Sequence, residues 1–162
     1  REEDKSGDCR KAWHKTLGAC GGNVQLVVDA NIIAAALLKE STTRLLLLSE
    51  GMELFAPEFL AEEIGKYSGY FAEKLCVGRA DVLLAFEELF AAAKITPVPA
   101  LEYGRFLEPA KRISPDPKDF PYFAVALKLA VPIWSNDKKL KMQDFVKIIS
   151  THELKSKKSW VG

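Results

Sequence analysis

Four short segments of the sequence place an acidic side chain next to a run of hydrophobic residues. These segments are Val27-Val28-Asp29, Glu62-Glu63-Ile64, Asp116-Pro117-Lys118-Asp119-Phe120 and Trp134-Ser135-Asn136-Asp137. Carboxylates that meet in one place raise each other's pKa, and they stay ionised together only when a counter-charge is present. Hard oxygen ligands at this density suit Mg²⁺ or Mn²⁺, which also bind phosphate oxygens. The segments therefore indicate a shared site for one or two such ions, which could activate water for attack on a phosphodiester.

Other kinds of chemistry have little support in the sequence. His14 and His152 lie near the termini, outside every acidic segment, which argues against a histidine acid–base mechanism and against a zinc hydrolase. The sequence has no G-x-x-x-x-G-K-[ST], G-x-G-x-x-G or G-x-S-x-G motif, so nucleotide binding and a serine nucleophile are not indicated. An aspartyl-phosphate phosphatase would need a second Asp where Asn31 stands.

Each acid has an ordinary explanation when it is taken alone. Asp119 could be a carboxylate that favours the start of a helix, and Glu63 could be a solvated helix residue in competition with Glu62. Asp137 could belong to a simple Ser-Asn-Asp turn. Asp29 is harder to explain in this way, because its position directly after Val27-Val28 offers only helix capping as an alternative role. Their combination is what favours a common site.

The positions of these acids depend on an alternation of strands and helices. The hydrophobic pattern predicts strands over 24–28, 52–56, 94–98, 131–134 and 145–149, separated by helices over 32–39, 41–48, 57–67, 80–93 and 118–129. This order predicts an α/β fold, a three-layer α/β/α sandwich with a mainly parallel central sheet. Ligands gather at the carboxyl ends of the strands in such sheets, so the four acids are expected at one edge.

The composition fits a single domain whose net charge is close to zero, so that only a local group of basic residues could bind a polyanion. The chain has 162 residues, 48% of them hydrophobic, and a net charge of +1. Lysines follow the last acidic segment, and we expect Lys138, Lys139 and Lys141 to hold a nucleic-acid backbone, with a solvated basic face as the alternative. The chain has no apolar run of membrane-spanning length and no signal-peptide pattern, which favours the cytoplasm.

The three cysteines, Cys9, Cys20 and Cys76, form no Cys-x-x-Cys pair. Free thiols are expected, because a zinc site built from Cys9, Cys20 and His14 would lack a fourth ligand. The domain organisation that we predict has three parts. Residues 1–23 form an N-terminal appendage of unknown role, 24–155 the α/β domain, and 156–162 a basic C-terminal tail.

Four stretches in this order resemble a PIN domain, the metal-dependent ribonuclease fold found in VapC-type toxins and in archaeal stand-alone relatives. The stretches are Val27–Asn31, Pro57–Ile64, Asp119–Leu127 and Trp134–Leu140, and the likeness runs from about Val24 to Thr151. The resemblance implies that four acids bind the metal and are catalytic: Asp29, Glu63, Asp119 and Asp137. It also implies that Asn31 and Ser135 lie close to the site and that Asp116 is an extra carboxylate at its rim.

The leading hypothesis is therefore a Mg²⁺- or Mn²⁺-dependent endoribonuclease that cleaves single-stranded RNA, leaving a 5′ phosphate and a 3′ hydroxyl. By the same resemblance the protein is expected to form a homodimer and to be the toxin of a toxin–antitoxin pair, with an antitoxin protein as its partner. The alternative is a PIN-fold module that binds nucleic acid or protein without catalysis.

Overall fold

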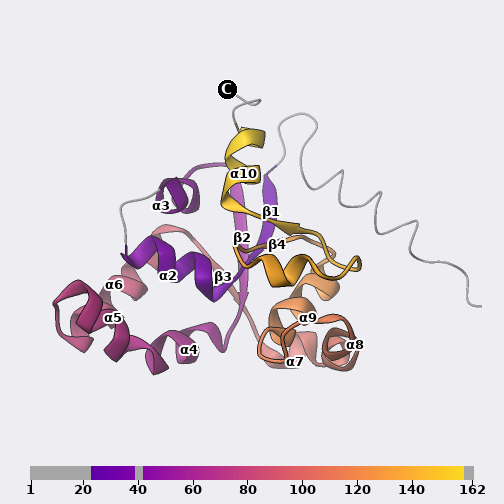
Figure 1. The fold of residues 1–162 in the computed structure, drawn as a ribbon, viewed down its shortest axis with the longest axis horizontal. Coiled ribbons are helices and arrows are strands. Elements are labelled where there is room, and N and C mark those ends of the chain that lie inside the picture. The colour runs from indigo at the N-terminus through magenta and orange to yellow at the C-terminus, as the bar shows by residue number, and fades with distance from the viewer. Residues whose placement is uncertain (1–22, 39–41, 159–162) are drawn as a thin grey trace, which may run out of the picture.

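The computed structural model describes residues 23–38 and 42–158. Its centre is a five-stranded, wholly parallel sheet with the strand order β3-β2-β1-β4-β5. The strands are β1 (Val24–Val28), β2 (Met52–Pro57), β3 (Thr96–Val98), β4 (Ile133–Trp134) and β5 (Ile148–Ile149). Helices cover both faces of this sheet, so the predicted three-layer α/β/α sandwich is confirmed (Figure 1).

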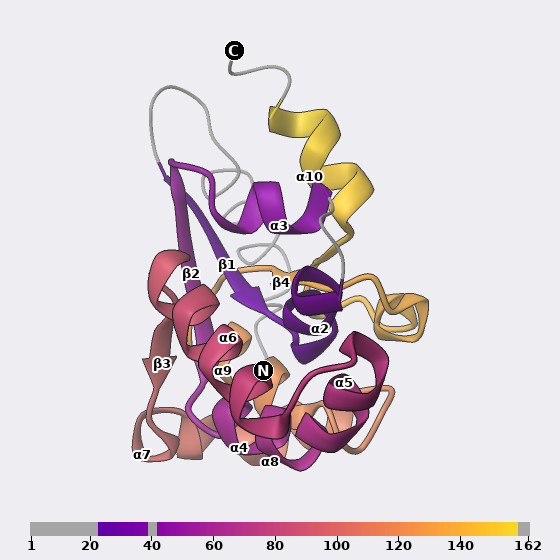
Figure 2. The ribbon, with the colours of Figure 1, turned by 90° about the vertical axis from the view of Figure 1, so that its left-hand side faces the viewer.

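The helices divide into two layers and a cap. On one side of the sheet lie α2 (Ala30–Leu38), α4 (Leu60–Lys66), α5 (Ser68–Leu75) and α6 (Arg79–Ala92). On the other lie α7 (Ala100–Tyr103), the 3₁₀ turn η1 (Gly104–Phe106), α8 (Leu107–Ile113) and α9 (Phe120–Leu129). The cap consists of α3 (Thr42–Leu47) and α10 (Thr151–Lys158), which contact each other at the end of the molecule opposite to α4 and α8 (Figure 2).

The central strand β1 and the helix α9 are rich in apolar residues because they are buried on most sides. Leu26, Val27 and Val28 of β1 have no exposed surface, as expected for a parallel strand covered by helices on both faces. Five consecutive residues of α9, from Tyr122 to Ala126, are also buried, so that this helix is enclosed on most of its circumference. Burial of a large aliphatic side chain stabilises the fold by about 1.5–3 kcal/mol.

The end of β4 is tied to α10 by two side chains. The buried Trp134 donates its indole N–H to Thr151 Oγ1 at 3.1 Å. Asn136 Oδ1 accepts a hydrogen bond from the backbone N–H of Thr151 at 2.8 Å. These bonds fix the chain on both sides of Ser135 and limit its movement at the sheet edge.

Several elements differ from those predicted. The pattern did not indicate α5, α7, α8 or α10. The strands expected over 94–98, 131–134 and 145–149 cover only 96–98, 133–134 and 148–149. Pro57 ends β2 instead of opening a helix, because it still pairs with Val98 of β3. The boundary predicted before residue 156 falls inside α10. The predicted appendage up to residue 22, with Cys9, His14 and Cys20, lies outside the described residues.

Some large apolar side chains lie outside the core. Phe86 is buried, whereas Leu45 and Leu48 of the Leu45–Leu48 run are exposed. Cys76 is a free, exposed thiol at the end of α5. In the described part of the chain, no helix has both the length and the apolar character needed to span a membrane.

Candidate active site

Asp29 and Ser135 lie at the point where the strand order of the sheet reverses. The chain passes from β1 to β2 on one side and later returns to β4 on the other, so β1 and β4 are neighbours whose connections diverge. Val28 pairs with Trp134, and the next backbone N–H, that of Asp29, donates to the carbonyl oxygen of Trp134 at 3.1 Å. Such a switch point is where open α/β sheets bind their ligands.

The carboxylate of Asp29 is buried and held by neutral donors. Only 3% of the residue is exposed, and Ser135 Oγ donates to Asp29 Oδ2 at 2.6 Å. The backbone N–H groups of Ala30 and Asn31, at the start of α2, also hydrogen-bond to it. The net effect raises the pKa of Asp29 to about 6. Burial is the largest cause, the hydrogen bond from Ser135 opposes it, and the charge of Glu63 acts in the same direction as burial.

Asp119 is the residue on which the other acids converge. It directly precedes α9, where no side-chain capping bond engages it. Burial raises its pKa most, and the total shift takes the pKa to about 7. The remaining influences are the negative charges of the other acids, in the order Asp29, Asp116, Glu63 and Asp137. Because such coupling weakens with distance, the charges of the three other predicted metal ligands and of Asp116 act on Asp119 from its neighbourhood.

Glu63 and Glu62 have different surroundings in the first turn of α4. Tyr122 of α9 donates its hydroxyl to Glu63 Oε2 at 2.8 Å, and the Tyr122 ring packs edge-on against Phe59 with the centroids 5.6 Å apart. Burial, and next the charge of Glu63, raises the pKa of Tyr122, so this hydroxyl remains a donor. Glu62 instead points into solvent and pairs with Lys66 at 3.7 Å. Glu63 is therefore the glutamate that faces the other acids.

Asp137 reaches the same place through Ser135. Its backbone N–H donates to Ser135 Oγ at 3.1 Å, and the same hydroxyl donates to Asp29. Asp137 opens the 3₁₀ helix η2 (Lys138–Lys141), where its Oδ1 accepts from the backbone N–H of Lys139 at 2.9 Å. A single buried serine thus connects two of the acids.

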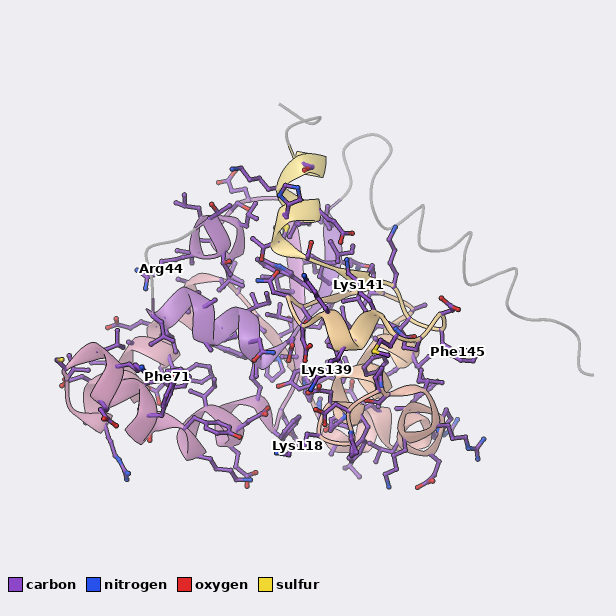
Figure 3. The ribbon with its side chains drawn as sticks, viewed as in Figure 1. Arg44, Phe71, Lys118, Lys139, Lys141 and Phe145 are labelled. Atoms are coloured by element: carbon purple, nitrogen blue, oxygen red, sulfur yellow. The ribbon has the colours of Figure 1, made fainter. Side chains whose placement is uncertain are left out.

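The remaining predicted residues lie around these acids. Asn31 is exposed, and its backbone, not its side chain, contacts Asp29 in the described structure. Asp116 accepts from the backbone N–H of Lys118 at 2.9 Å, and its charge reaches Asp119. The ammonium group of Lys141 is engaged by Glu153 of α10. Lys139 follows the end of β4, Lys118 comes just before α9, and both are exposed (Figure 3).

The donor chemistry of the site fits a hard cation. All four acids offer carboxylate oxygens, and the neighbouring hydroxyls of Ser135 and Tyr122 are neutral. The side chains as they stand are not closed around a common point, since among the described residues no three Asp, Glu, His or Cys side chains form a group that could hold a metal ion. A cation would have to draw the carboxylates together.

Residues 27–158 match the PIN domain family. The chain belongs to this family. PIN domains are in general nucleases and typically use divalent metals, so the acids of this PIN domain lie on a nuclease-type fold. No curated protein matches the sequence at a significant level.

Sequence reasoning missed Tyr122 as a member of the site. A signal was present, because Tyr122 lies three residues after Asp119 and residues three apart share a face of a helix. A buried tyrosine also needs a partner for its hydroxyl. That the partner is Glu63, on another helix, depends on how the α4 segment meets α9 and could not be predicted from the sequence of α9 alone.

Proposed function

We propose that this PIN domain is a Mg²⁺- or Mn²⁺-dependent endoribonuclease that hydrolyses phosphodiester bonds of single-stranded RNA. The observation that carries the proposal is the convergence of acids on Asp119, whose pKa of about 7 reflects burial and four neighbouring carboxylates. A protein gains nothing for folding from such a cluster, since each buried like charge opposes the next. The arrangement is understandable when a cation and a phosphate occupy the site.

The residues that would hold the ion are Asp29, Glu63, Asp119 and Asp137. When bound, the ion supplies Lewis-acid chemistry at the scissile phosphodiester. Three of the four carboxylates are oriented by donors within the chain: Ser135 for Asp29, Tyr122 for Glu63 and the Lys139 backbone for Asp137. Hydrogen bonds to ligand atoms of this kind fix the direction in which a carboxylate points.

Asp119 has a different part in the site. With a pKa of about 7 it carries a proton for much of the time near neutral pH. Ligation of a cation requires the ionised form, so binding of the ion releases this proton. Lys118, next to Asp119, and Lys138 and Lys139, directly after Asp137, are exposed cations that would meet the RNA backbone.

Cleavage of an end-labelled single-stranded RNA in Mn²⁺ or Mg²⁺ tests the proposal. We expect products with 5′ phosphates, no cleavage in excess EDTA, and little cleavage of a duplex. Asp29→Asn and Asp137→Asn should reduce the rate by at least about 100-fold. Glu63→Gln should do the same, whereas Glu62→Gln, its solvent-facing neighbour, serves as the matched control and should cleave normally. Cleavage that persists in EDTA or in Asp29→Asn would overturn the proposal.

A second candidate function is a binding module that keeps the fold without catalysis. The separation of the carboxylates favours it, because no three of them in the described structure form a group ready to hold a metal ion. It predicts RNA binding at low salt with no product at any Mn²⁺ concentration.

The expected cellular role and partners are part of the proposal. We propose a toxin that an antitoxin protein holds inactive, and a homodimer. Exposed apolar side chains suitable for contacts between chains are Leu45 and Leu48 on the α3 side, and Tyr67, Tyr70 and Leu84 on the α4–α6 side. Light scattering tests the dimer, and an open reading frame immediately upstream that encodes a binding partner would support the toxin role.

A further inference from the structure

The segment after η2 exposes two large apolar side chains that the fold does not use. Met142 is 79% exposed and Phe145 is 65% exposed, although both lie only a few residues from Asp137. A single exposed apolar side chain is ordinary on a protein surface. Two of them on the segment that follows Asp137 of the site are less usual, and they indicate a binding surface.

The segment is held rigidly by the amide of Gln143. Its Nε2 donates to the carbonyl oxygens of Leu140 at 2.9 Å and Val146 at 2.7 Å. Its Oε1 accepts from the backbone N–H groups of Phe145 and Val146, both at 2.8 Å. Leu140 and Val146 are buried and anchor both ends. The fold therefore displays Met142 and Phe145 on a fixed turn, and their exposure is not a result of fraying.

The charges beside this turn are mainly positive. Lys138 and Lys139 are exposed, and among the described residues no acidic side chain forms an ion pair with either of them. Asp144 is the opposing charge on the turn, and Lys141 is already engaged by Glu153. In the view of Figure 3, Lys139 lies near the centre of the molecule and Phe145 lies at its outer edge.

We propose that Phe145, on the same turn as Met142, is a platform on which a base of single-stranded nucleic acid stacks while its backbone passes Lys139 toward the acids. This inference rests on the proposed function and adds to it a residue that selects for unpaired bases. An aromatic ring accepts any base, because every base has a π-face, and the bases of a duplex are already stacked. The platform would therefore favour single strands without reading their sequence.

The surroundings of the ring favour a nucleic acid over a protein partner. A stable protein interface buries roughly 800 Å² on each side, far more than two side chains supply. The rim of lysines would also oppose a second copy of this chain, since it would bring like charges together. Phosphates beside the ring would instead complement Lys138 and Lys139.

Fluorescence anisotropy with two labelled oligomers of about 12 nucleotides tests the platform. One is single-stranded oligoadenylate, and the other is an abasic strand of the same length, which keeps the phosphates but has no bases. Both are titrated with the full chain in EDTA at low salt, so that cleavage does not interfere. Phe145→Ala should bind oligoadenylate about ten-fold more weakly than the wild type does and the abasic strand equally well. Phe145→Tyr should bind as the wild type does.

Val77→Ala is the matched control, because Val77 is 44% exposed between α5 and α6, at the other side of the molecule from Phe145. It should leave both affinities unchanged, and thermal melting checks that each variant is folded. Equal binding of oligoadenylate by Phe145→Ala and wild type overturns the inference, as does an equal loss for both oligomers or the absence of wild-type binding to oligoadenylate. A change of oligomeric state in Phe145→Ala would also overturn it, in favour of contact between protein chains.

Cleavage by the wild type in Mn²⁺, measured on the same oligoadenylate, separates this inference from the proposed function. If the wild type does not cleave but Phe145→Ala loses base-dependent binding, the nuclease proposal fails and the platform stands. If the wild type cleaves and Phe145→Ala binds and cleaves normally, the platform fails and the nuclease proposal stands.

Discussion

Replacing Asp29 by Asn should make the metal-free protein more stable at alkaline pH. The carboxylate is 3% exposed, and burial raises its pKa from 3.8 to about 6. Above that pKa the folded state must hold a negative charge in an environment that solvates it poorly. Asn has nearly the same shape and can still accept the hydrogen bond from Ser135, so the substitution removes the charge and leaves the packing intact.

The size of the effect follows from the pKa. A rise of about two pKa units, at about 1.4 kcal/mol for each unit, corresponds to ~3 kcal/mol. For a raised pKa, the contribution to stability is fully present below the unfolded value of 3.8 and is lost as pH rises through about 6. Asp29→Asn should therefore exceed the wild type by up to ~3 kcal/mol at pH 8 and match it at pH 4. For a chain of this size the gain at pH 8 corresponds to roughly 6–12 °C in Tm.

Urea unfolding in EDTA at pH 4, 6 and 8, followed by tryptophan fluorescence, measures this difference. Glu62→Gln is the control, because Glu62 is exposed and its removal should change stability by less than about 0.5 kcal/mol at every pH. The same Asp29→Asn protein should be inactive in the RNA cleavage assay.

Two results would refute the reasoning. If Asp29→Asn is less stable than the wild type at pH 8, the carboxylate contributes net favourable hydrogen bonds and its burial is not the dominant influence. If the difference between the two proteins is the same at pH 4 and pH 8, ionisation of Asp29 is not its cause.

Four further predictions concern other residues of the site and one residue outside it. Ser135→Ala should raise the pKa of Asp29 above about 6, because a donor to the ionised form is lost; carboxyl NMR titration checks this, and an unchanged pKa contradicts it. Tyr122→Phe should lower the free energy of unfolding in urea by about 1–2 kcal/mol and should weaken Mn²⁺ binding, measured by electron paramagnetic resonance. An unchanged Mn²⁺ affinity would show that the hydroxyl has a structural role only. Mn²⁺ at about 100 times its Kd should add ~2.7 kcal/mol to the free energy of unfolding. The affinity for Mn²⁺ should rise between pH 5.5 and pH 8, because the ion displaces the proton of Asp119, and a Kd that does not change with pH in calorimetry would argue against this. Ala130→Gly should raise stability by about 0.5–1 kcal/mol, since Ala130 has φ 54° after α9; a lower Tm would contradict this explanation.

The layered fold was predictable because the apolar runs alternate with helical stripes. Leu26–Val28 and Ile133–Trp134 are buried on both faces of the sheet, and their sequences are therefore continuous apolar runs. The helices α5 and α8 were missed because each is short, with eight and seven residues, and follows another helical segment with almost no intervening loop. Their positions are set by packing, α5 against α6 and α8 against α9, which local sequence does not encode.

The candidate site was predictable only to the level of segments. Strand ends indicated where Asp29 and Asp137 lie, because parallel strands bring their carboxyl ends to one edge. The distinction between Glu62 and Glu63 depends on Tyr122, which is 59 positions away in the chain. The pairing of Lys141 with Glu153 likewise needs the return of α10 to η2. Contacts of this separation arise from tertiary packing, and no local pattern specifies them.

Repulsion between the carboxylates explains both the raised pKa of Asp119 and the distance that the acids keep from one another. The charges that raise the pKa of Asp119 would oppose any closer approach of four ionised carboxylates, so the described arrangement keeps them near but not closed. The rigid parts of the site are instead neutral: the Ser135 hydroxyl, the Tyr122 hydroxyl and the backbone of β1 and β4. These donors orient the carboxylates but do not neutralise their negative charges. The uncompensated charges lower the stability of the metal-free fold, and the same charges favour binding of a cation. The same substitution that abolishes that affinity at Asp29 should therefore stabilise the fold.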